Sequence, residues 1–349
     1  MPLFSSAPES LCILRLSAIG DVCNAVSVVQ AIQKQWPNTK ITWVMGKMEA
    51  QLLSDLPNVN VLVFDKNRGI KAYFELWRAL KGKRFDALLH LQTALRASIV
   101  SLGIKAKYKL GFDAQRSSDM QSFFINHKVP SPKSAHVLDG FKAFILELGI
   151  EDEPLQWHIP ISRQDQQWAL TKVNNKATVV VVPGASKAYK NWTAQGYAQV
   201  IDHLVKKGFQ VILAGSPAEV EIDLAEKVVK HCPVNMINLV GKSSLKQMLA
   251  LLKESKLVIA PDTGPAHMAV AVNTPVIGLY AHHNPLRTGP YLYRDYVVSA
   301  YQQAIEAETG KKLSDLSWRA RVKDPQAMQR IKVCDVVNMV DKAVTDFSL

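Results

Sequence analysis

Short apolar segments typical of β-strands alternate with amphipathic segments typical of helices along nearly the whole chain. Because parallel strands need a crossover connection, this alternation predicts parallel sheets with helices packed on their faces, an α/β class of fold. The alternation occurs twice, and the two series are separated by residues 151–161, which carry two prolines and show no periodicity. The chain of 349 residues is long enough for two domains with separate cores. We expect a first domain over 1–161, a second over 162–325, and a C-terminal helix over 326–349 that packs back on the first domain.

The period of the apolar residues predicts the individual elements. In the first series we expect strands at 11–16, 40–45, 59–64, 86–91 and 107–111, with helices near 20–35, 47–55, 70–82, 93–102 and 135–149. In the second series, after a short helix at 163–173, we expect strands at 177–182, 209–214, 236–239, 257–260 and 275–280, with helices near 193–206, 217–230, 244–253, 264–272 and 326–346.

Two segments join a buried strand to a polar turn and then to a helix. In the second series the strand at 257–260 runs into Asp262-Thr263-Gly264, and Pro265 opens the helix. In the first series the strand at 11–16 runs into the turn 17–20. Such a turn brings backbone N–H groups and the positive end of a helix to the carboxyl edge of a sheet, where an anion binds well. The pair of turns predicts a cleft enzyme that handles a nucleotide-linked substrate.

Asp21 is the candidate catalytic residue of the first turn. It follows Gly20 at the start of the helix, and a carboxylate there is suited to act as general base on a hydroxyl nucleophile. The alternative is a carboxylate that only stabilises the helix N-terminus.

The second turn offers a candidate diphosphate site. Thr263 and Gly264 supply a hydroxyl and backbone donors, and His267 lies on the first turn of the same helix. Two phosphates carry more charge than a helix end offsets, so a cation is expected nearby, and Lys190 in the loop after the strand at 177–182 is a candidate. The alternatives are a helix N-cap for Asp262, an internal contact for His267 and a solvated loop residue for Lys190.

Two other sequence features, Glu219 and the pair of histidines at 282–283, can be explained without a bound ligand. Glu219 completes a capping box with Ser216, and Pro217 occupies the first helical position. His282 and His283 follow a predicted strand, but adjacent side chains there point apart and no third ligand has suitable spacing. The chain has no Cys-x-x-Cys pair, so we expect no bound metal.

The net charge of +12 is unevenly distributed. Residues 66–116 contain twelve Lys and Arg against three Asp and Glu, which predicts a basic surface suited to nucleic acid, anionic lipid or a phosphorylated substrate. A nucleic-acid-binding protein is disfavoured because no helix-turn-helix, zinc-finger or RNA-binding aromatic signature occurs. No apolar run approaches 20 residues, and residues 1–10 lack a signal-peptide pattern, so we expect a cytoplasmic protein.

Four segments resemble, in the same order, motifs of the ADP-heptose:lipopolysaccharide heptosyltransferases of glycosyltransferase family 9. They are Ile13-Leu-Arg-Leu-Ser-Ala-Ile-Gly-Asp21, Lys190-Asn-Trp192, Pro261-Asp-Thr-Gly-Pro-Ala-His267 and Asn284-Pro-Leu-Arg-Thr-Gly-Pro-Tyr291. The resemblance covers essentially the whole chain and is closest to enzymes that add the first heptose to the inner-core Kdo of lipid A. It implies a GT-B architecture, two Rossmann-like domains facing each other across a cleft, and an inverting transfer that needs no metal or other cofactor.

The resemblance also implies a role for each candidate. Asp21 would deprotonate the Kdo hydroxyl of the acceptor. The ADP-heptose donor would be held by Lys190, Glu219, Gly241, Ser243, Asp262, Thr263, Gly264 and His267, with Glu219 at the ribose and Gly241 and Ser243 beside adenine. The phosphates and carboxylates of Kdo–lipid A would meet Lys66, Arg68, Lys71, Arg96, Arg116 and His136.

The same basic face would hold the protein on the anionic cytoplasmic surface of the inner membrane. A GT-B transferase or epimerase that uses another nucleotide-sugar is the alternative within enzymes.

Overall fold

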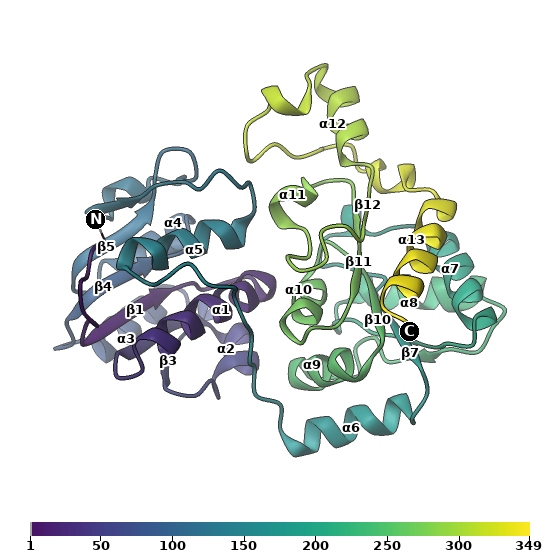
Figure 1. The fold of residues 1–349 in the computed structure, drawn as a ribbon, viewed down its shortest axis with the longest axis horizontal. Coiled ribbons are helices and arrows are strands. Elements are labelled where there is room, and N and C mark those ends of the chain that lie inside the picture. The colour runs from purple at the N-terminus through teal and green to yellow at the C-terminus, as the bar shows by residue number, and fades with distance from the viewer. Residues whose placement is uncertain (1) are drawn as a thin grey trace. The chain divides into compact units, whose positions relative to one another are not determined.

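The computed structural model describes residues 2–349. These residues form two compact units, 2–160 and Ile161–Leu349 (Figure 1). Each unit is a six-stranded parallel sheet with helices on its faces, so the predicted α/β class is confirmed. The predicted strands lie within two residues of the observed ones. The division between the units falls one residue before the predicted end of the first domain.

The sheet of the first unit has the strand order β3-β2-β1-β4-β5-β6. Its strands are β1 (Ser10–Leu14), β2 (Lys40–Gly46), β3 (Val59–Phe64), β4 (Phe85–His90), β5 (Ala106–Phe112) and β6 (His127–Val129). The side chains of 11–14 are fully buried because β1 is covered on both faces, as is usual in a parallel sheet. The chain leaves β1 towards β2 and returns to β4, so the strand order reverses between β1 and β4. Ligands of doubly wound folds bind at such a reversal, beyond the carboxyl ends of the strands.

The helices of the first unit are α1 (Ile19–Gln35), α2 (Lys47–Leu53), α3 (Ile70–Ala79), α4 (Leu95–Ser101) and α5 (Val137–Leu148), with short 3₁₀ turns η1 (Lys66–Arg68) and η2 (Gln121–Phe123). Helices α1 and α5 pack against each other, and α3 packs against α4. One hydrophobic core contains residues of β1, β3 and β4 together with residues of α3 and α4. It includes Leu14, Phe64, Leu76, Leu88 and Val100.

The sheet of the second unit has the order β12-β11-β10-β7-β8-β9. Its strands are β7 (Thr178–Val181), β8 (Gln210–Leu213), β9 (Ile237–Asn238), β10 (Leu257–Pro261), β11 (Val276–Tyr280) and β12 (Val297–Ser299). Its helices are α6 (Arg163–Val173), α7 (Ala194–Lys206), α8 (Glu219–His231), α9 (Leu245–Glu254), α10 (Gly264–Ala271), α11 (Pro285–Thr288), α12 (Tyr301–Thr309) and α13 (Val333–Asp346). The strand order reverses between β7 and β10. Four of these strands and α-helices were not predicted, β6, α11, β12 and α12. The two strands have three residues and α11 has four, too few to show a period, and α12 buries only three residues.

The C-terminal helix packs on its own unit, where the sequence led us to expect it on the first. Helix α13 contacts α7 and β12 (Figure 1). Its buried side chains Val336, Val340 and Ala343 belong to the same core as Ile201 and Leu204 of α7. An amphipathic pattern predicts that one face of a helix is covered, but it does not specify which surface covers it.

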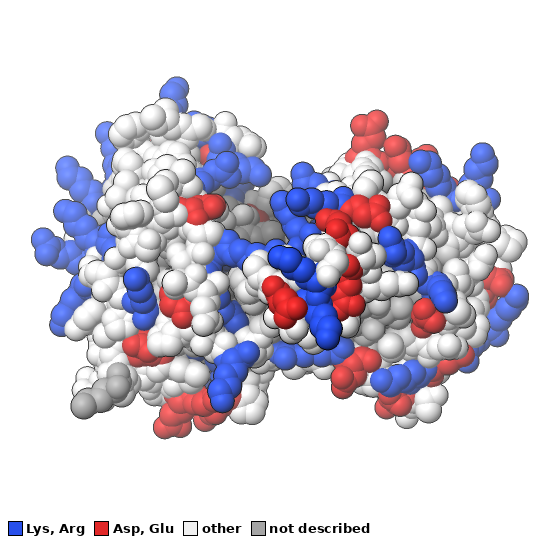
Figure 2. Space-filling model, turned by 90° about the horizontal axis from the view of Figure 1, so that it is seen from above, with Lys and Arg blue, Asp and Glu red and all other residues white. Residues whose placement is uncertain are grey.

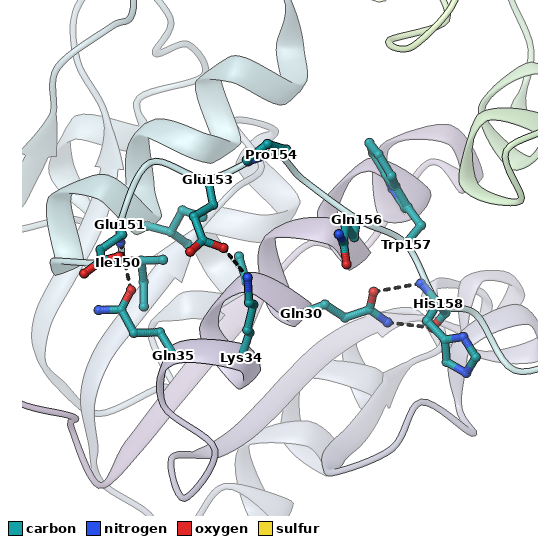
Figure 3. A pocket seen from close by; sticks show the side chains of 12 residues that line it. Gln30, Lys34, Gln35, Ile150, Glu151, Glu153, Pro154, Gln156, Trp157 and His158 are labelled. Atoms are coloured by element: carbon teal, nitrogen blue, oxygen red, sulfur yellow. Dashed lines mark hydrogen bonds and ion pairs between the residues drawn. The ribbon is translucent and has the colours of Figure 1, made fainter.

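The non-periodic segment before the second unit is held along α1 (Figure 3). Gln30 donates to the carbonyl of His158 at 2.6 Å and accepts from its amide at 2.8 Å. Gln35 likewise accepts from the amide of Glu151 at 2.8 Å. A cavity of about 540 Å³ lies between this segment and the helix. The segment is thus irregular, as predicted, and fixed to the first unit by side-chain hydrogen bonds.

Candidate functional site

Asp21 lies at the carboxyl edge of the first sheet, in the first turn of α1. Its carboxylate accepts a hydrogen bond from the amide of Ala18 at 3.3 Å and forms an ion pair with Arg15. The guanidinium of Arg15 also donates to the carbonyl of Leu91 at 2.6 Å, at the end of the neighbouring strand β4. The side chain of Asp21 is 31% exposed. The carboxylate therefore stabilises the helix end and remains accessible at the reversal of strand order.

Residues after β4 hold the turn that precedes Asp21. Gln92 accepts from the amide of Leu16 at 2.7 Å and donates to the hydroxyl of Ser17 at 3.4 Å. Gln121 in turn donates to the carbonyl of His90 at 2.9 Å. Burial lowers the pKa of His90 to about 3, so its ring is neutral near pH 7.

Sequence reasoning missed Arg15, His90 and Gln92. The signal was present, because Arg15 directly follows β1, while His90 lies at the end of the predicted strand next along the sheet and Gln92 follows it, and polar residues at such strand ends share one carboxyl edge.

Four of the six residues expected at the acceptor are exposed on the first unit. Lys66 and Arg68 lie in η1, Lys71 in α3 and Arg96 in α4. Lys66 and Arg96 line one groove of about 500 Å³. Arg68 forms an ion pair with Glu75 at 2.7 Å.

The other two, Arg116 and His136, are buried and lie together. Arg116 is 4% exposed and donates to the carbonyl of His136 at 3.0 Å and to that of Ser134. The ring of His136 is the N-cap of α5, since its Nδ1 accepts from the amide of Leu138 at 3.0 Å. Both side chains therefore shape the loop before α5.

In the second unit Asp262 follows β10 and binds two cationic or protonated groups. Its Oδ2 lies 2.7 Å from Nζ of Lys190 and 2.5 Å from Nδ1 of His283. Burial opposes ionisation of this carboxyl, but the hydrogen bond from His283 and the charge of Lys190 outweigh it and lower the pKa of Asp262 well below 3.8. Because an ionised carboxylate only accepts hydrogen bonds, Nδ1 of His283 carries the proton between them.

The start of α10 lies directly after this cluster. Thr263 is the N-cap residue, and its side chain makes no capping hydrogen bond. The alternative interpretation, in which Asp262 is the N-cap, is therefore wrong. Gly264 begins the helix, and His267 is 8% exposed in its first turn. Nζ of Lys190 also donates to the carbonyl of Asp262 at 3.3 Å, so the ammonium group contacts the residue directly before the N-cap of α10, as expected of a phosphate site.

The predicted capping box at the start of α8 is wrong. The helix was expected to begin at Pro217, but it begins two residues later, at Glu219. Its N-cap residue is Ala218, which has no side chain able to cap the helix. Glu219 is exposed. Ser216 instead donates to Glu221, from its amide at 2.8 Å and from its hydroxyl at 2.6 Å. The glutamate with a defined position at this end of the helix is therefore Glu221, which is 6% exposed.

Two glycines leave space for the carboxylate of Glu221. A Cβ on Gly184, after β7, would lie 2.7 Å from Cγ of Glu221, and one on Gly215, after β8, would lie 2.9 Å from its Oε2. Gly215 also accepts a hydrogen bond from the amide of Gly241 at 3.1 Å. Gly241 has φ of +74°, a conformation that favours glycine. The buried hydroxyl of Ser243 has no hydrogen-bond partner among residues 2–349.

Glu221, Gly241, Ser243 and the Asp262 cluster therefore all lie at the carboxyl edge of one sheet. Within residues 2–349, no group of three or more His, Cys, Asp and Glu side chains could hold a metal ion. His282 and His283 bind different partners, the carbonyl of Val322 at 3.1 Å and Asp262. Within the same range, no helix is long and apolar enough to span a bilayer.

The chain is similar to known proteins over nearly its whole length. The chain is 46% identical over 343 residues to the lipopolysaccharide core heptosyltransferase OpsX of Haemophilus influenzae, covering 98% of this chain and 99% of that protein. Its fold is similar to a family 9 glycosyltransferase from Veillonella parvula, with TM-score 0.79, 20% identity and 97% of each chain covered. It is also similar to the Escherichia coli heptosyltransferase WaaC with ADP, with TM-score 0.72, 21% identity, and 96% and 99% of the two chains covered. These likenesses confirm the GT-B class of fold.

The sequence model of glycosyltransferase family 9, the heptosyltransferases, matches residues 73–316. That match spans most of the chain, and the OpsX relative aligns along nearly its full length. The chain with Asp21 at one sheet edge and the Lys190–Asp262 pair at another therefore belongs to glycosyltransferase family 9.

Proposed function

We propose that the protein transfers L-glycero-D-manno-heptose from ADP-heptose to the inner-core Kdo of lipid A, or to phosphorylated Kdo, with inversion at the anomeric carbon. The observation that carries the proposal is the cluster of Lys190 and His283 on Asp262 beside the N-terminus of α10. The relatives named for lipopolysaccharide heptose transfer, and the WaaC structure with ADP, support this choice of donor.

The diphosphate of the donor binds at this cluster. Lys190, the hydroxyl of Thr263, the backbone at Gly264 and His267 meet the phosphate oxygens, while Asp262 holds Lys190 and His283 in position. The ADP that leaves carries the negative charge that develops in the reaction. A fixed ammonium group and a helix N-terminus stabilise that charge in the transition state more than in the bound donor.

The nucleoside part of ADP binds further along the same sheet edge. We assign the contact with the ribose to Glu221 and no longer to Glu219, because the carboxylate of Glu221 is buried at this edge and Glu219 is exposed. A carboxylate held by Ser216 is a good acceptor for ribose hydroxyls. The close backbone at Gly241 and the hydroxyl of Ser243 lie beside the base.

Asp21 is the general base of the transfer. As the acceptor oxygen bonds to the anomeric carbon, its proton passes to the Asp21 carboxylate, and the bond from that carbon to the phosphate oxygen breaks. Attack opposite the leaving ADP inverts the configuration. Arg15 keeps the carboxylate oriented through its ion pair and its contact with Leu91. Lys66, Arg68, Lys71 and Arg96 bind the phosphates and carboxylates of the acceptor, on the cytoplasmic face of the inner membrane.

The test is release of ADP from ADP-heptose with and without Kdo–lipid A, for the wild type and for Asp21→Asn. We expect acceptor-dependent release that falls by about 10²–10⁴-fold in the variant, the usual contribution of a general base. ADP affinity should be unchanged, because the donor residues lie in the second unit. Asp119→Asn, an exposed substitution in the same unit, is the control. Release from a uridine-linked sugar but not from ADP-heptose would favour the alternative, a GT-B enzyme with another donor.

A further inference from the structure

The segment between α12 and α13 is paired with the two residues that follow β11. Arg321 and His283 form an isolated antiparallel bridge. The amide of Val322 donates to the carbonyl of His282 at 3.0 Å. In the other direction, Nδ1 of His282 donates to the carbonyl of Val322 at 3.1 Å, because a carbonyl oxygen only accepts. A part of the chain distant in sequence therefore lies at the carboxyl end of β11.

The bridge places the side chain of Arg321 beside the Asp262 cluster. In an antiparallel pair, directly opposite residues have their side chains on one face, with Cβ atoms about 4.5–5.5 Å apart. The ring of His283 binds Asp262, and Asp262 also binds Lys190. The side chain of Arg321 therefore leaves the backbone on the same face as the ring that binds Asp262.

Two further contacts fix the segment that carries Arg321. The hydroxyl of Tyr301, whose side chain is buried, donates to the carbonyl of Ala320 at 2.9 Å. The guanidinium of Arg287 in α11 lies over the ring of Trp318, with Cζ 4.4 Å from the ring centre. Neither contact uses the side chain of Arg321, so a substitution of that side chain leaves the segment attached.

The charge of Arg321 is available to a ligand. The residue is exposed, and within residues 2–349 no acidic side chain pairs with its guanidinium. Lys190 is paired with Asp262, so the charges of these two groups cancel. A nucleoside diphosphate carries several negative charges, which this pair and the end of a helix offset only in part. An arginine on the same face supplies further positive charge, and its planar fork suits phosphate oxygens.

Arg321 does not belong to a general basic patch. Residues 301–323 contain five Lys and Arg and three Asp and Glu. Figure 2, which views the molecule from the side of α12, shows Lys and Arg side chains interspersed with Asp and Glu side chains over the second unit. The position of Arg321, opposite a residue of the Asp262 cluster, therefore distinguishes it from the neighbouring cations.

We propose that Arg321 binds the terminal phosphate of the nucleoside diphosphate and stabilises it as a leaving group. When the bond from the anomeric carbon to the oxygen of that phosphate breaks, the electron pair remains on the oxygen. The guanidinium then meets the charge that the phosphate gains. The leaving-group role rests on the proposed function, whereas the contact with the phosphate requires only that a nucleoside diphosphate binds.

The test compares the affinities of the full chain for ADP and AMP by calorimetric titration, because AMP lacks the phosphate assigned to Arg321. We expect Arg321→Met to bind ADP about tenfold more weakly or worse, since it loses a charged hydrogen-bonding group. Its affinity for AMP should be unchanged. Arg321→Lys should recover part of the affinity for ADP, because it restores the charge without the fork.

The control is Lys311→Met, which removes an exposed charge of the same segment and should bind both nucleotides as the wild type does. Thermal unfolding of Arg321→Met should match that of the wild type, because the side chain is exposed. An unchanged affinity for ADP in Arg321→Met, or an equal loss in the control, would overturn the proposal. Equal losses for ADP and AMP would also overturn it, because the arginine would then act on a part common to both nucleotides.

Heptose transfer separates this proposal from the proposed function. We expect Arg321→Met to lower kcat for acceptor-dependent release of ADP from ADP-heptose by about tenfold or more. A retained kcat would overturn the leaving-group role. Absence of transfer by a wild type whose affinity for ADP depends on Arg321 would overturn the proposed function alone. If the chain binds uridine nucleotides in place of ADP, the same comparison of UDP with UMP tests Arg321.

Discussion

The ammonium group of Lys190 lies 2.7 Å from the carboxylate of Asp262, although the two residues are 72 positions apart in the sequence. The contact joins the loop after β7 to the turn after β10, and these two strands are neighbours in the sheet. His283, which follows β11, reaches the same carboxylate. The segments that follow three adjacent strands, β7, β10 and β11, thus each place one side chain at the same point of the carboxyl edge.

Loss of the charge on Asp262 should weaken donor binding. Asp262→Asn keeps the shape of the side chain but releases Lys190 and His283 from a charged partner, and hydrogen bonds to charged groups contribute about 1.5–3 kcal/mol. We expect the KM for ADP-heptose to rise about tenfold or more, with a smaller effect on kcat. Asp202→Asn, which removes the partly exposed ion pair with Lys206, is the matched control and should leave both constants unchanged. An unaltered KM in Asp262→Asn would contradict the role of the cluster.

The same carboxylate predicts how stability depends on pH. The pKa of Asp262 is lower in the folded protein than its ordinary value of 3.8, so its ionised form stabilises the fold. That contribution is fully present above about pH 4 and is lost as the pH falls towards the lowered pKa. Urea unfolding of the wild type and Asp262→Asn should therefore show a stability difference that is constant from pH 7 to about pH 5 and shrinks by pH 3. A difference that grows on acidification would contradict this sign.

The sequence predicted the strands and the residues at their ends because both depend on local pattern. A buried run followed by a polar turn specifies the carboxyl edge, and Asp21, Lys190 and Asp262 were found in that way. The partners of those residues depend on which strands are neighbours, so the pairing of Lys190 with Asp262 and the contact of Arg15 with Leu91 were not predicted.

The start of α8 shows the limit of local pattern most clearly. Ser216 and Glu219 fit a capping box by spacing, yet Ser216 binds Glu221, whose carboxylate occupies the space left by Gly184 and Gly215. Gly215 adjoins Ser216 in the sequence, but Gly184 follows another strand, β7, and nothing near α8 in the sequence indicates it. The choice between two glutamates was therefore made by tertiary packing.

Glu219 and Glu221, the two glutamates in the first turn of α8, form a matched pair of variants. Glu221→Gln should weaken ADP binding about tenfold, because a carboxylate accepts ribose hydroxyls better than an amide does. It should also lower the free energy of unfolding by about 1–2 kcal/mol through its weaker bonds to Ser216. Glu219→Gln should change neither quantity, since this side chain is exposed at the helix start. Calorimetric titration with ADP and urea unfolding measure the two effects. A larger loss of ADP affinity in Glu219→Gln than in Glu221→Gln would assign the ribose contact to Glu219.

Arg15 should act as a positioning residue for Asp21. Its guanidinium joins Asp21 to the end of β4 and lies 5.3 Å from the ring centre of Phe141, so Arg15→Met keeps the apolar contact and removes the ion pair. We expect kcat for heptose transfer to fall about tenfold to a hundredfold, because a misoriented base loses much of its effect. The KM for ADP-heptose should not change, since the donor residues lie in the second unit. Arg15→Lys should restore part of kcat by supplying one charged contact, whereas Lys105→Met, an exposed charge removal in the same unit, should have no effect. A variant in which KM rises while kcat is retained would instead place Arg15 in substrate binding.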